Sequence, residues 1–228
     1  MITVLQPDVT VPLDRFSDWI AEEGQDYRVI PLEHQPVPAL DDCGAGIIVL
    51  GGRKDAVTVS ESPFLEDVYR LLRAAVDREV PVLGICLGHQ ILGHASGGTV
   101  ALGHPAQGEE GAYDVTLTAA GAADPLFTGL DETFLAAESH HDVVEVLPED
   151  ATLLATSKAC PNQAFRIGSA VSVQFHPEVS PATMGKWTAG DGGDGAEMAA
   201  HMTRVDEKVR AGGRIIARNF VRIVSGTN

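Results

Sequence analysis

Residues 80–98 read VPVLGICLGHQILGHASGG, and this stretch decides the fold. The apolar run 80–85 is typical of a buried strand, and the segment from about 88 to 95 has the pattern of a helix. Cys86 stands between them, with a glycine two residues away on each side. Because a strand followed by a helix is the repeating unit of a parallel α/β sheet, the stretch predicts one unit of such a sheet.

The segments before residue 80 repeat this alternation. They predict strands over 1–5, 27–32 and 45–50. They also predict a helix over about 12–20, which Gly24 terminates, and a second helix over 62–76. After Gly98 the pattern changes to short strands that we expect to be antiparallel and to extend or cover the sheet: 99–102, 113–118, 133–139, 143–147, 151–156, 163–167 and 170–175. A flexible loop is expected over 189–195 and helices over about 197–211 and 214–224.

The predicted fold class is therefore α/β. We expect one open, twisted, mixed sheet with a parallel core and an antiparallel extension, flanked by helices. The 228 residues suffice for one domain with a large core, and the chain has no long linker rich in proline and glycine. We predict a single domain, 1–228, with a core over 1–180 and a C-terminal loop and helices over 181–228.

Composition excludes several classes of function. The formal net charge of −16 argues against binding to nucleic acid or to an anionic membrane, because both need a basic surface. The three cysteines are odd in number and form no CxxC pair, so a disulfide framework or a cysteine zinc site is not expected. With neither a signal peptide nor an apolar run long enough to span a membrane, a cytoplasmic protein is the expectation.

The sequence Gly84-Ile85-Cys86-Leu87-Gly88 has the G-x-nucleophile-x-G form of a nucleophile elbow. Such an elbow exposes a reactive side chain on a sharp turn between strand and helix. The helix N-terminus favours a thiolate, and the Leu87 amide would face a developing oxyanion. The alternative is a buried structural cysteine between two packing glycines. A catalytic thiol also needs a base.

Among the eight histidines, His176 is the best candidate for that base. The strand pattern 171–175 ends in His176-Pro177-Glu178, and the proline biases His176 towards an extended conformation. A carboxylate two residues beyond a histidine can bind one ring nitrogen and leave the other free to accept a proton. The alternative is a solvent-exposed turn with a chance histidine. The other candidates are interpreted as helix or loop residues without a role: His34, His89, His94, His104 and His201.

GICLGHQ at 84–90 with QFHPE at 174–178 resembles the class I (triad) glutamine amidotransferases. Gly51-Gly52 is similar to the glycine-rich oxyanion loop of that family. Residues 138–142, ESHHD, resemble its substrate loop, in a form similar to the amidotransferase part of GMP synthetases. The resemblance covers about 3–179 and implies a flavodoxin-like fold and one glutamine amidotransferase type 1 domain.

The resemblance implies a role for each matching residue. Cys86 would attack the side-chain amide of glutamine, His176 would carry the proton, and Glu178 would orient His176. The amides of Gly52 and Leu87 would form the oxyanion hole. The resemblance places substrate binding on the residues Gly51, Gln90, Ser139, His140, His141 and Asp142. No cofactor and no metal are expected, although His140, His141 and Asp142 leave a metal site open as an alternative.

The chain departs from the pattern of the family at one position. Arg53 follows Gly51-Gly52 where relatives commonly have proline; the loop would then be more mobile, or Arg53 would serve a partner or an allosteric contact.

No phosphate-binding loop and no SGGxDS signature are present, so ammonia would pass to a separate synthase subunit or another acceptor. The sequence allows a homo-oligomer.

Three functions are compatible with these motifs. The favoured one is an amidotransferase that hydrolyses glutamine and passes ammonia to a synthase partner. The second is a γ-glutamyl amide or peptide hydrolase that uses the same triad without a partner. The third is a non-catalytic regulatory or binding module, against which the intact Cys86, His176 and Glu178 argue.

Overall fold

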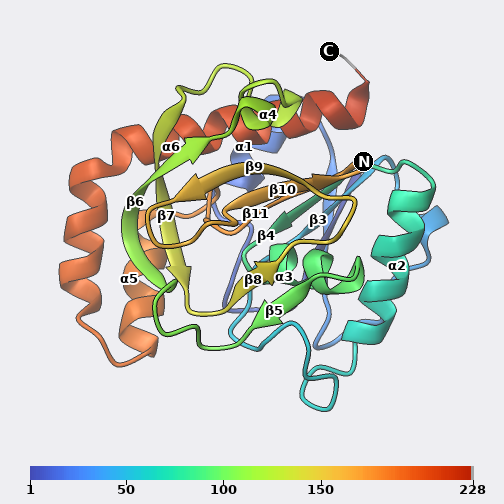
Figure 1. Cartoon of the computed structure of the whole chain (residues 1–228), viewed down its shortest axis with the longest axis horizontal. Helices are drawn as coiled ribbons and strands as arrows, with labels where there is room; N and C mark the ends of the chain where they lie inside the picture. Colours follow the sequence, from blue (N-terminus) through green and yellow to red (C-terminus); the bar gives the residue numbers. More distant parts are fainter. Residues whose placement is uncertain (227–228) are drawn as a thin grey trace.

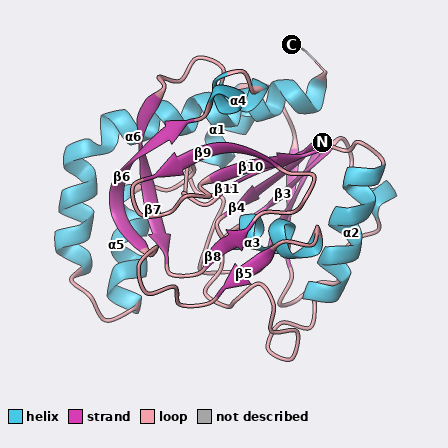
Figure 2. Ribbon diagram, viewed as in Figure 1, coloured by secondary structure: helices cyan, strands magenta, loops and turns pink. Residues whose placement is uncertain are grey.

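The computed structural model describes residues 1–226; residues 227 and 228, the last two of the predicted domain 1–228, lie outside the described part. The centre of the fold is a mixed sheet of nine strands in the order β2-β1-β3-β4-β11-β10-β9-β6-β7 (Figure 1). Helices lie on both sides of this sheet (Figure 2). The arrangement confirms the predicted α/β class with a parallel core and an antiparallel extension.

Five neighbouring strands form the parallel part of the sheet. They are β2 (Tyr27–Pro31), β1 (Ile2–Gln6), β3 (Gly46–Val49), β4 (Val82–Ile85) and β11 (Ala170–Val173). All four residues of β3, β4 and β11 are buried, because helices cover both faces of the sheet there. This explains why these strands read as continuous apolar runs rather than as alternating patterns.

The remaining strands are antiparallel. Beyond β11 lie β10 (Ala164–Ile167), β9 (Thr152–Ser157), β6 (Glu109–Leu117) and β7 (Thr133–His140). A separate two-stranded sheet pairs β5 (Thr99–Ala101) with β8 (Val143–Val146). The expected mixture of extending and covering strands is therefore present, but the last predicted strand belongs to the parallel part: β11 pairs parallel with β4.

Two of the three apolar clusters among the described residues pack helices against the two faces of the sheet. On one face α1 (Phe16–Glu22) and α6 (Gly195–Ser225) bury residues such as Phe16 and Phe220. On the other face α2 (Leu65–Asp77) and α3 (Leu87–Ala95) bury residues such as Leu72 and Ile91. Three short helical turns complete the fold: η1 (Leu40–Asp42), α4 (Ala119–Ala122) and η2 (Pro125–Phe127). The first helix is predicted over about 12–20, but α1 begins only at Phe16, so Pro12 lies outside the helix.

The C-terminal part differs most from the sequence prediction. The loop expected over 189–195 is reduced to residues 191–194, because α5 (Pro181–Gly190) precedes it and α6 begins at Gly195. The two predicted helices are one continuous helix of 31 residues, α6. A Cβ atom at Gly213 would lie 2.0 Å from the carbonyl oxygen of Pro177. The glycine is thus a packing contact against the His-Pro-Glu segment rather than a break in the helix.

Within residues 1–226 we find no helix that combines the length and the apolar character needed to cross a membrane. The three cysteines, Cys43, Cys86 and Cys160, are buried and unbridged.

Candidate active site

Cys86 occupies the sharp turn between β4 and α3. Its backbone has φ 51° and ψ −104°, a conformation that L-residues rarely adopt and that marks a strained position. The turn is possible because residue 88 is a glycine and has no side chain. A Cβ atom at Gly88 would clash with the carbonyl oxygen of Val49 on the neighbouring strand, at a distance of only 2.2 Å. Gly88 therefore lets α3 begin directly against β3, and the strand–elbow–helix geometry predicted from the sequence is present.

The register of β11 against β4 brings the second motif to the cysteine. Val173 lies opposite Ile85, and the Cys86 amide continues this ladder by donating to the Val173 carbonyl at 2.9 Å. The His176 amide, three residues further on, donates to the carbonyl of Ala137 on β7 at 2.8 Å. Two segments separated by about ninety residues in sequence thus end at the same edge of the sheet.

His176 and Glu178 form a buried pair beside Cys86. His176 Nδ1 lies 2.8 Å from a carboxylate oxygen of Glu178, which fixes the imidazole orientation. Burial by itself lowers the His176 pKa, but the charges of Glu178 and Cys86 and the hydrogen bonds to both outweigh burial and raise this pKa well above its usual value. His176 therefore holds a proton readily.

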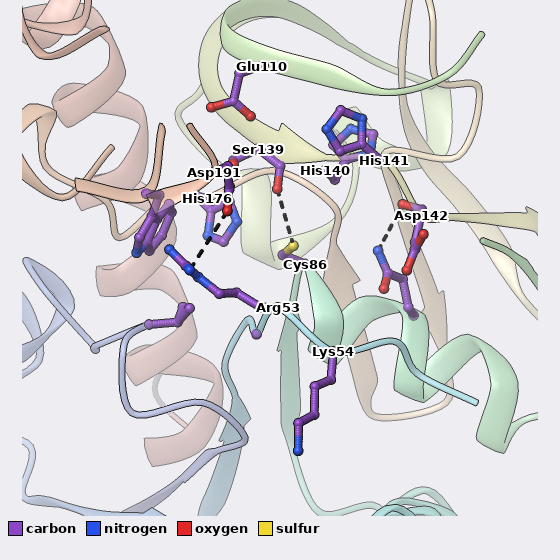
Figure 3. Close-up of a pocket in the computed structure, with 14 residues that line it drawn as sticks. Arg53, Lys54, Cys86, Glu110, Ser139, His140, His141, Asp142, His176 and Asp191 are labelled. Atoms are coloured by element: carbon purple, nitrogen blue, oxygen red, sulfur yellow. Dashed lines mark hydrogen bonds and ion pairs between the residues drawn. The ribbon is translucent and has the colours of Figure 1, made fainter. Parts of the chain in front are cut away.

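A cavity of about 330 Å³ opens in front of the sulfur atom, a size suited to a small ligand. Figure 3 shows Cys86, His176 and Ser139 together at its centre. The Cys86 sulfur lies 3.8 Å from the carbonyl oxygen of Ser139. The other residues around the cavity are Val11, Gly52, Arg53, Lys54, Gln90, Glu110, His140, His141, Asp142, Trp187 and Asp191.

The two glycines after β3 lie against the reactive pair. A Cβ atom at Gly51 would lie 3.0 Å from Cε1 of His176 and 3.6 Å from Cβ of Cys86. A Cβ atom at Gly52 would lie 2.7 Å from the Leu87 side chain. The structure therefore brings Gly51, Gly52 and Leu87 together around Cys86, as an oxyanion site formed by peptide amides requires.

Gln90 connects α3 to the predicted substrate loop. Its amide nitrogen donates to the Asp142 carbonyl at 2.9 Å and lies 3.3 Å from Oε1 of Gln174. The Asp142 carboxylate in turn accepts from the Gly103 amide at 2.7 Å. Gln90 and Asp142 both border the cavity, but these hydrogen bonds show that their polar groups also hold the loop in place.

His140 differs from its neighbours in the substrate loop. His141 is exposed at the cavity, whereas the His140 side chain is 1% exposed and points into the protein. There its Nε2 atom lies 3.5 Å from Glu109 and 3.4 Å from Glu138. Glu109, Glu138 and His140 offer ligand atoms within 4.8 Å of one another. Of the three residues in the metal site considered from the sequence, this group contains His140 but neither His141 nor Asp142.

Sequence reasoning misses several residues of this site. Trp187, on α5, packs its ring 4.8 Å from the His176 ring and donates its indole N–H to the Thr10 carbonyl at 3.0 Å. Asp191 forms an ion pair of 3.8 Å with Arg53 at the cavity edge (Figure 3). The Ser180-Pro181 pair, a common start of a helix, is the available signal for α5. Nothing local in the sequence points to Glu109 or Glu110.

Comparison with known proteins gives consistent results. The family description "Glutamine amidotransferase class-I" matches residues 17–190. One subunit of the glutamine-hydrolysing GMP synthase of Pyrococcus abyssi is 31% identical over 188 residues, which cover 77% of this chain and 92% of the relative. The glutamine-hydrolysing GMP synthase of Thermomicrobium roseum is 36% identical over 140 residues, 61% of this chain but only 24% of that longer protein.

A solved structure shows the same fold. The crystal structure of a glutamine amidotransferase from Thermotoga maritima superposes with a TM-score of 0.83 at 25% identity, covering 98% of each chain. Together with the family match over more than half of the sequence, this shows that the chain belongs to the class I glutamine amidotransferase family.

Proposed function

We propose that this protein hydrolyses the side-chain amide of glutamine to glutamate and ammonia through a thioester on Cys86. The observation that carries the proposal is the meeting of Cys86 with the His176–Glu178 pair at one cavity, although the two segments lie far apart in sequence. Cys86, His176 and Glu178 are assigned as nucleophile, proton carrier and orienting group.

The proposed reaction begins when His176 takes the thiol proton and the Cys86 sulfur attacks the amide carbon. The amides of Gly52 and Leu87 stabilise the resulting oxyanion. His176 then gives its proton to the amide nitrogen, the carbon–nitrogen bond breaks, and ammonia leaves. His176 next takes a proton from water, whose hydroxide attacks the thioester; release of glutamate restores the thiol. The net reaction converts glutamine and water to glutamate and ammonia.

Glutamine binding is assigned to the groups that border the rest of the cavity. Gly51 keeps the space between the oxyanion loop and His176 open, since even a methyl group there would meet the imidazole at 3.0 Å. Gln90, with the loop of Ser139, His140, His141 and Asp142, forms the opposite wall. In this loop the main chain at 139 and 140 and the side chains at 141 and 142 are proposed to face the substrate, because the His140 side chain points inward.

We further propose that the ammonia is passed to a separate synthase protein. The supporting observation is the match to a relative described as one subunit of a glutamine-hydrolysing GMP synthase, of which this chain covers 92%. A tagged preparation of this protein, used to capture candidate synthases, tests the idea when glutamine turnover is measured with and without the captured protein. An increase in turnover supports the partner; unchanged turnover with every captured protein contradicts it.

One observation favours a second candidate, a γ-glutamyl amide or peptide hydrolase. Four exposed or partly exposed charged residues, Arg53, Lys54, Glu110 and Asp191, lie at the cavity and could bind charged groups that glutamine lacks. Turnover of glutamine and of γ-glutamyl dipeptides, measured side by side, separates the two candidates. A higher kcat/KM on the dipeptides would replace the first proposal by the second.

The experiment that tests the shared chemistry is the substitution Cys86→Ala. It should abolish glutamate release while the protein keeps its fold and binds glutamine, because only the nucleophile is removed. Glutamate release is measured by a coupled assay, and glutamine binding by calorimetry. A Cys86→Ala protein with full activity would refute the assignment.

A further inference from the structure

One oxygen of the Glu178 carboxylate is bound and the other is not. Oε1 lies 2.8 Å from Nδ1 of His176, whereas Oε2 has no hydrogen-bond partner among residues 1–226. The Glu178 side chain is also fully buried. Because no second side chain holds this carboxylate, its position against the imidazole depends on how the main chain at residue 178 is fixed.

The loop directly before α1 binds the main chain that carries Glu178. The Arg15 amide donates to the Glu178 carbonyl at 3.2 Å, and the Arg15 guanidinium donates to the Val179 carbonyl at 3.4 Å. The Asp14 carboxylate accepts from both the amide and the hydroxyl of Ser180, at 2.9 Å and 2.8 Å. These hydrogen bonds connect two segments that lie 166 residues apart in the sequence.

Asp14 has an unusual backbone conformation. Its φ angle is 43°, in the left-handed region that residues other than glycine rarely adopt. The Ser17 hydroxyl donates to the Asp14 carbonyl at 2.5 Å and helps to hold this conformation. Glycine would adopt it without strain, so what an aspartate adds at this position is the carboxylate that binds Ser180.

Helix α6 supports the same segment from a second side. The Arg15 guanidinium forms a bidentate ion pair with Asp206 of α6, at 2.8 Å and 3.0 Å. Gly213 of α6 packs so closely that a Cβ atom there would lie 2.0 Å from the Pro177 carbonyl oxygen. The chain around Glu178 is therefore held between the loop before α1 and a long helix.

We propose that Asp14 is a positioning residue for the reaction: through Ser180 it fixes the main chain of Glu178 and so keeps the Glu178 carboxylate on Nδ1 of His176. Asp14 does not border the cavity, so it acts through Glu178 and not on the substrate. The inference rests on the proposed function in so far as Glu178 orients His176.

The first test observes the hydrogen bond between His176 and Glu178 directly, in the folded full-length protein. A proton held between an imidazole nitrogen and a carboxylate gives a far-downfield proton NMR resonance, and its loss in His176→Asn identifies it. Asp14→Ala should move this resonance upfield and speed its exchange with water, because the hydrogen bond lengthens. Asp14→Asn, which keeps an acceptor oxygen and tolerates the same backbone conformation, should largely restore it.

Asp124 offers a matched control. Its carboxylate also accepts from a nearby amide, that of Leu126 at 2.9 Å, and it pairs with Arg166 at 2.6 Å, but Asp124 does not border the cavity. Asp124→Asn removes a charge from a partly buried loop, as Asp14→Asn does. It should leave the downfield resonance where the wild type has it.

The second test is kinetic and separates positioning from a general packing effect. Asp14→Ala should lower kcat for glutamine hydrolysis by about fivefold to tenfold and leave KM within about twofold, because the reacting groups are misplaced while the substrate contacts remain. In a Glu178→Gln background the same substitution should cost less than about twofold, because two residues that act on the same hydrogen bond are not additive.

Four results would overturn the proposal. They are a folded Asp14→Ala protein with an unmoved resonance, a wild type that lacks the resonance, an equal loss of kcat from Asp14→Ala with and without Glu178→Gln, and an equally large resonance shift in Asp124→Asn. Glutamine turnover that survives Cys86→Ala, or is absent in the wild type, would instead contradict the proposed function. The NMR test needs no turnover, so it still reports on Asp14 in that case.

Discussion

Two buried histidines of the site, His176 and His140, have different partners. His176 borders the cavity and has one carboxylate partner, Glu178. The His140 side chain is 1% exposed and lies between two carboxylates, Glu109 and Glu138. Both environments raise the pKa of the imidazole. Both side chains are almost fully buried, 3% and 1% exposed, so the difference between the two histidines lies in their partners rather than in their exposure.

The largest expected effect on kcat follows from replacing His176, which borders the cavity. His176→Asn should lower kcat for glutamine hydrolysis by roughly 10³-fold, because it removes the proposed general base and acid. His140→Gln should lower kcat far less, because the proposed proton carrier remains. Steady-state kinetics on both folded variants measures this difference. Equal losses in the two variants would show that the two histidines do not have separate roles.

The next largest effect concerns Glu178, the carboxylate proposed to orient His176. Glu178→Ala should lower kcat by about 10- to 100-fold, less than loss of the nucleophile or of the base, because the imidazole is still present but loses its fixed orientation. Packing of the Trp187 ring against His176 limits the loss. The same steady-state assay measures it. A Glu178→Ala variant as inactive as Cys86→Ala would mean that Glu178 takes part more directly than an orienting group.

A smaller effect is expected on stability at alkaline pH. Since the folded-state pKa of His140, about 10, exceeds the unfolded value near 6.5, its stabilising proton is fully present below pH 6.5 and is lost as the pH rises towards 10. The free energy of unfolding should fall between pH 7 and 9 by up to about 1.4 kcal/mol per pH unit for this proton. Urea unfolding at several pH values measures this dependence. The free energy of unfolding should fall less steeply with pH in His140→Gln than in the wild type, and an equally steep fall would contradict the charged state of His140.

The smallest and opposite effect belongs to His89. Its folded-state pKa of about 3 lies below the unfolded value, so the unfolded chain binds the extra proton and the protein loses stability as the pH falls from about 6.5 towards 3. His89→Gln should therefore reduce acid destabilisation and leave the alkaline slope unchanged. The same urea series, extended to pH 4, measures this, and an altered alkaline slope in His89→Gln would remove its value as a control.

The sequence alone predicts the parallel part of the fold well. Strand β4 and helix α3 follow from an apolar run, a cysteine and flanking glycines. The strand before His176-Pro177-Glu178 is also predicted, but the sequence makes it antiparallel, whereas β11 pairs parallel with β4. These are local signals, in which the residue types themselves limit the backbone.

Other features depend on contacts between distant residues, which no local pattern reveals. Gly212-Gly213 has the composition of a helix break, but α6 continues because Gly213 packs against Pro177. The sequence groups His140 with the substrate loop on the basis of its neighbours. Only the β6–β7 register, which sets Glu109 opposite it, shows that its side chain is buried. Trp187 escapes notice because the glycine-rich residues that follow it suggest a loop rather than the helix α5.

The central claim is that Cys86 faces the cavity beside His176 and reacts there with glutamine, and labelling with an electrophilic glutamine analogue tests it most directly. One label per chain is expected on Cys86, with none on the buried Cys43 or Cys160, and excess glutamine should protect Cys86 from labelling. A folded protein that takes up no label, or that is labelled on another cysteine, would contradict it.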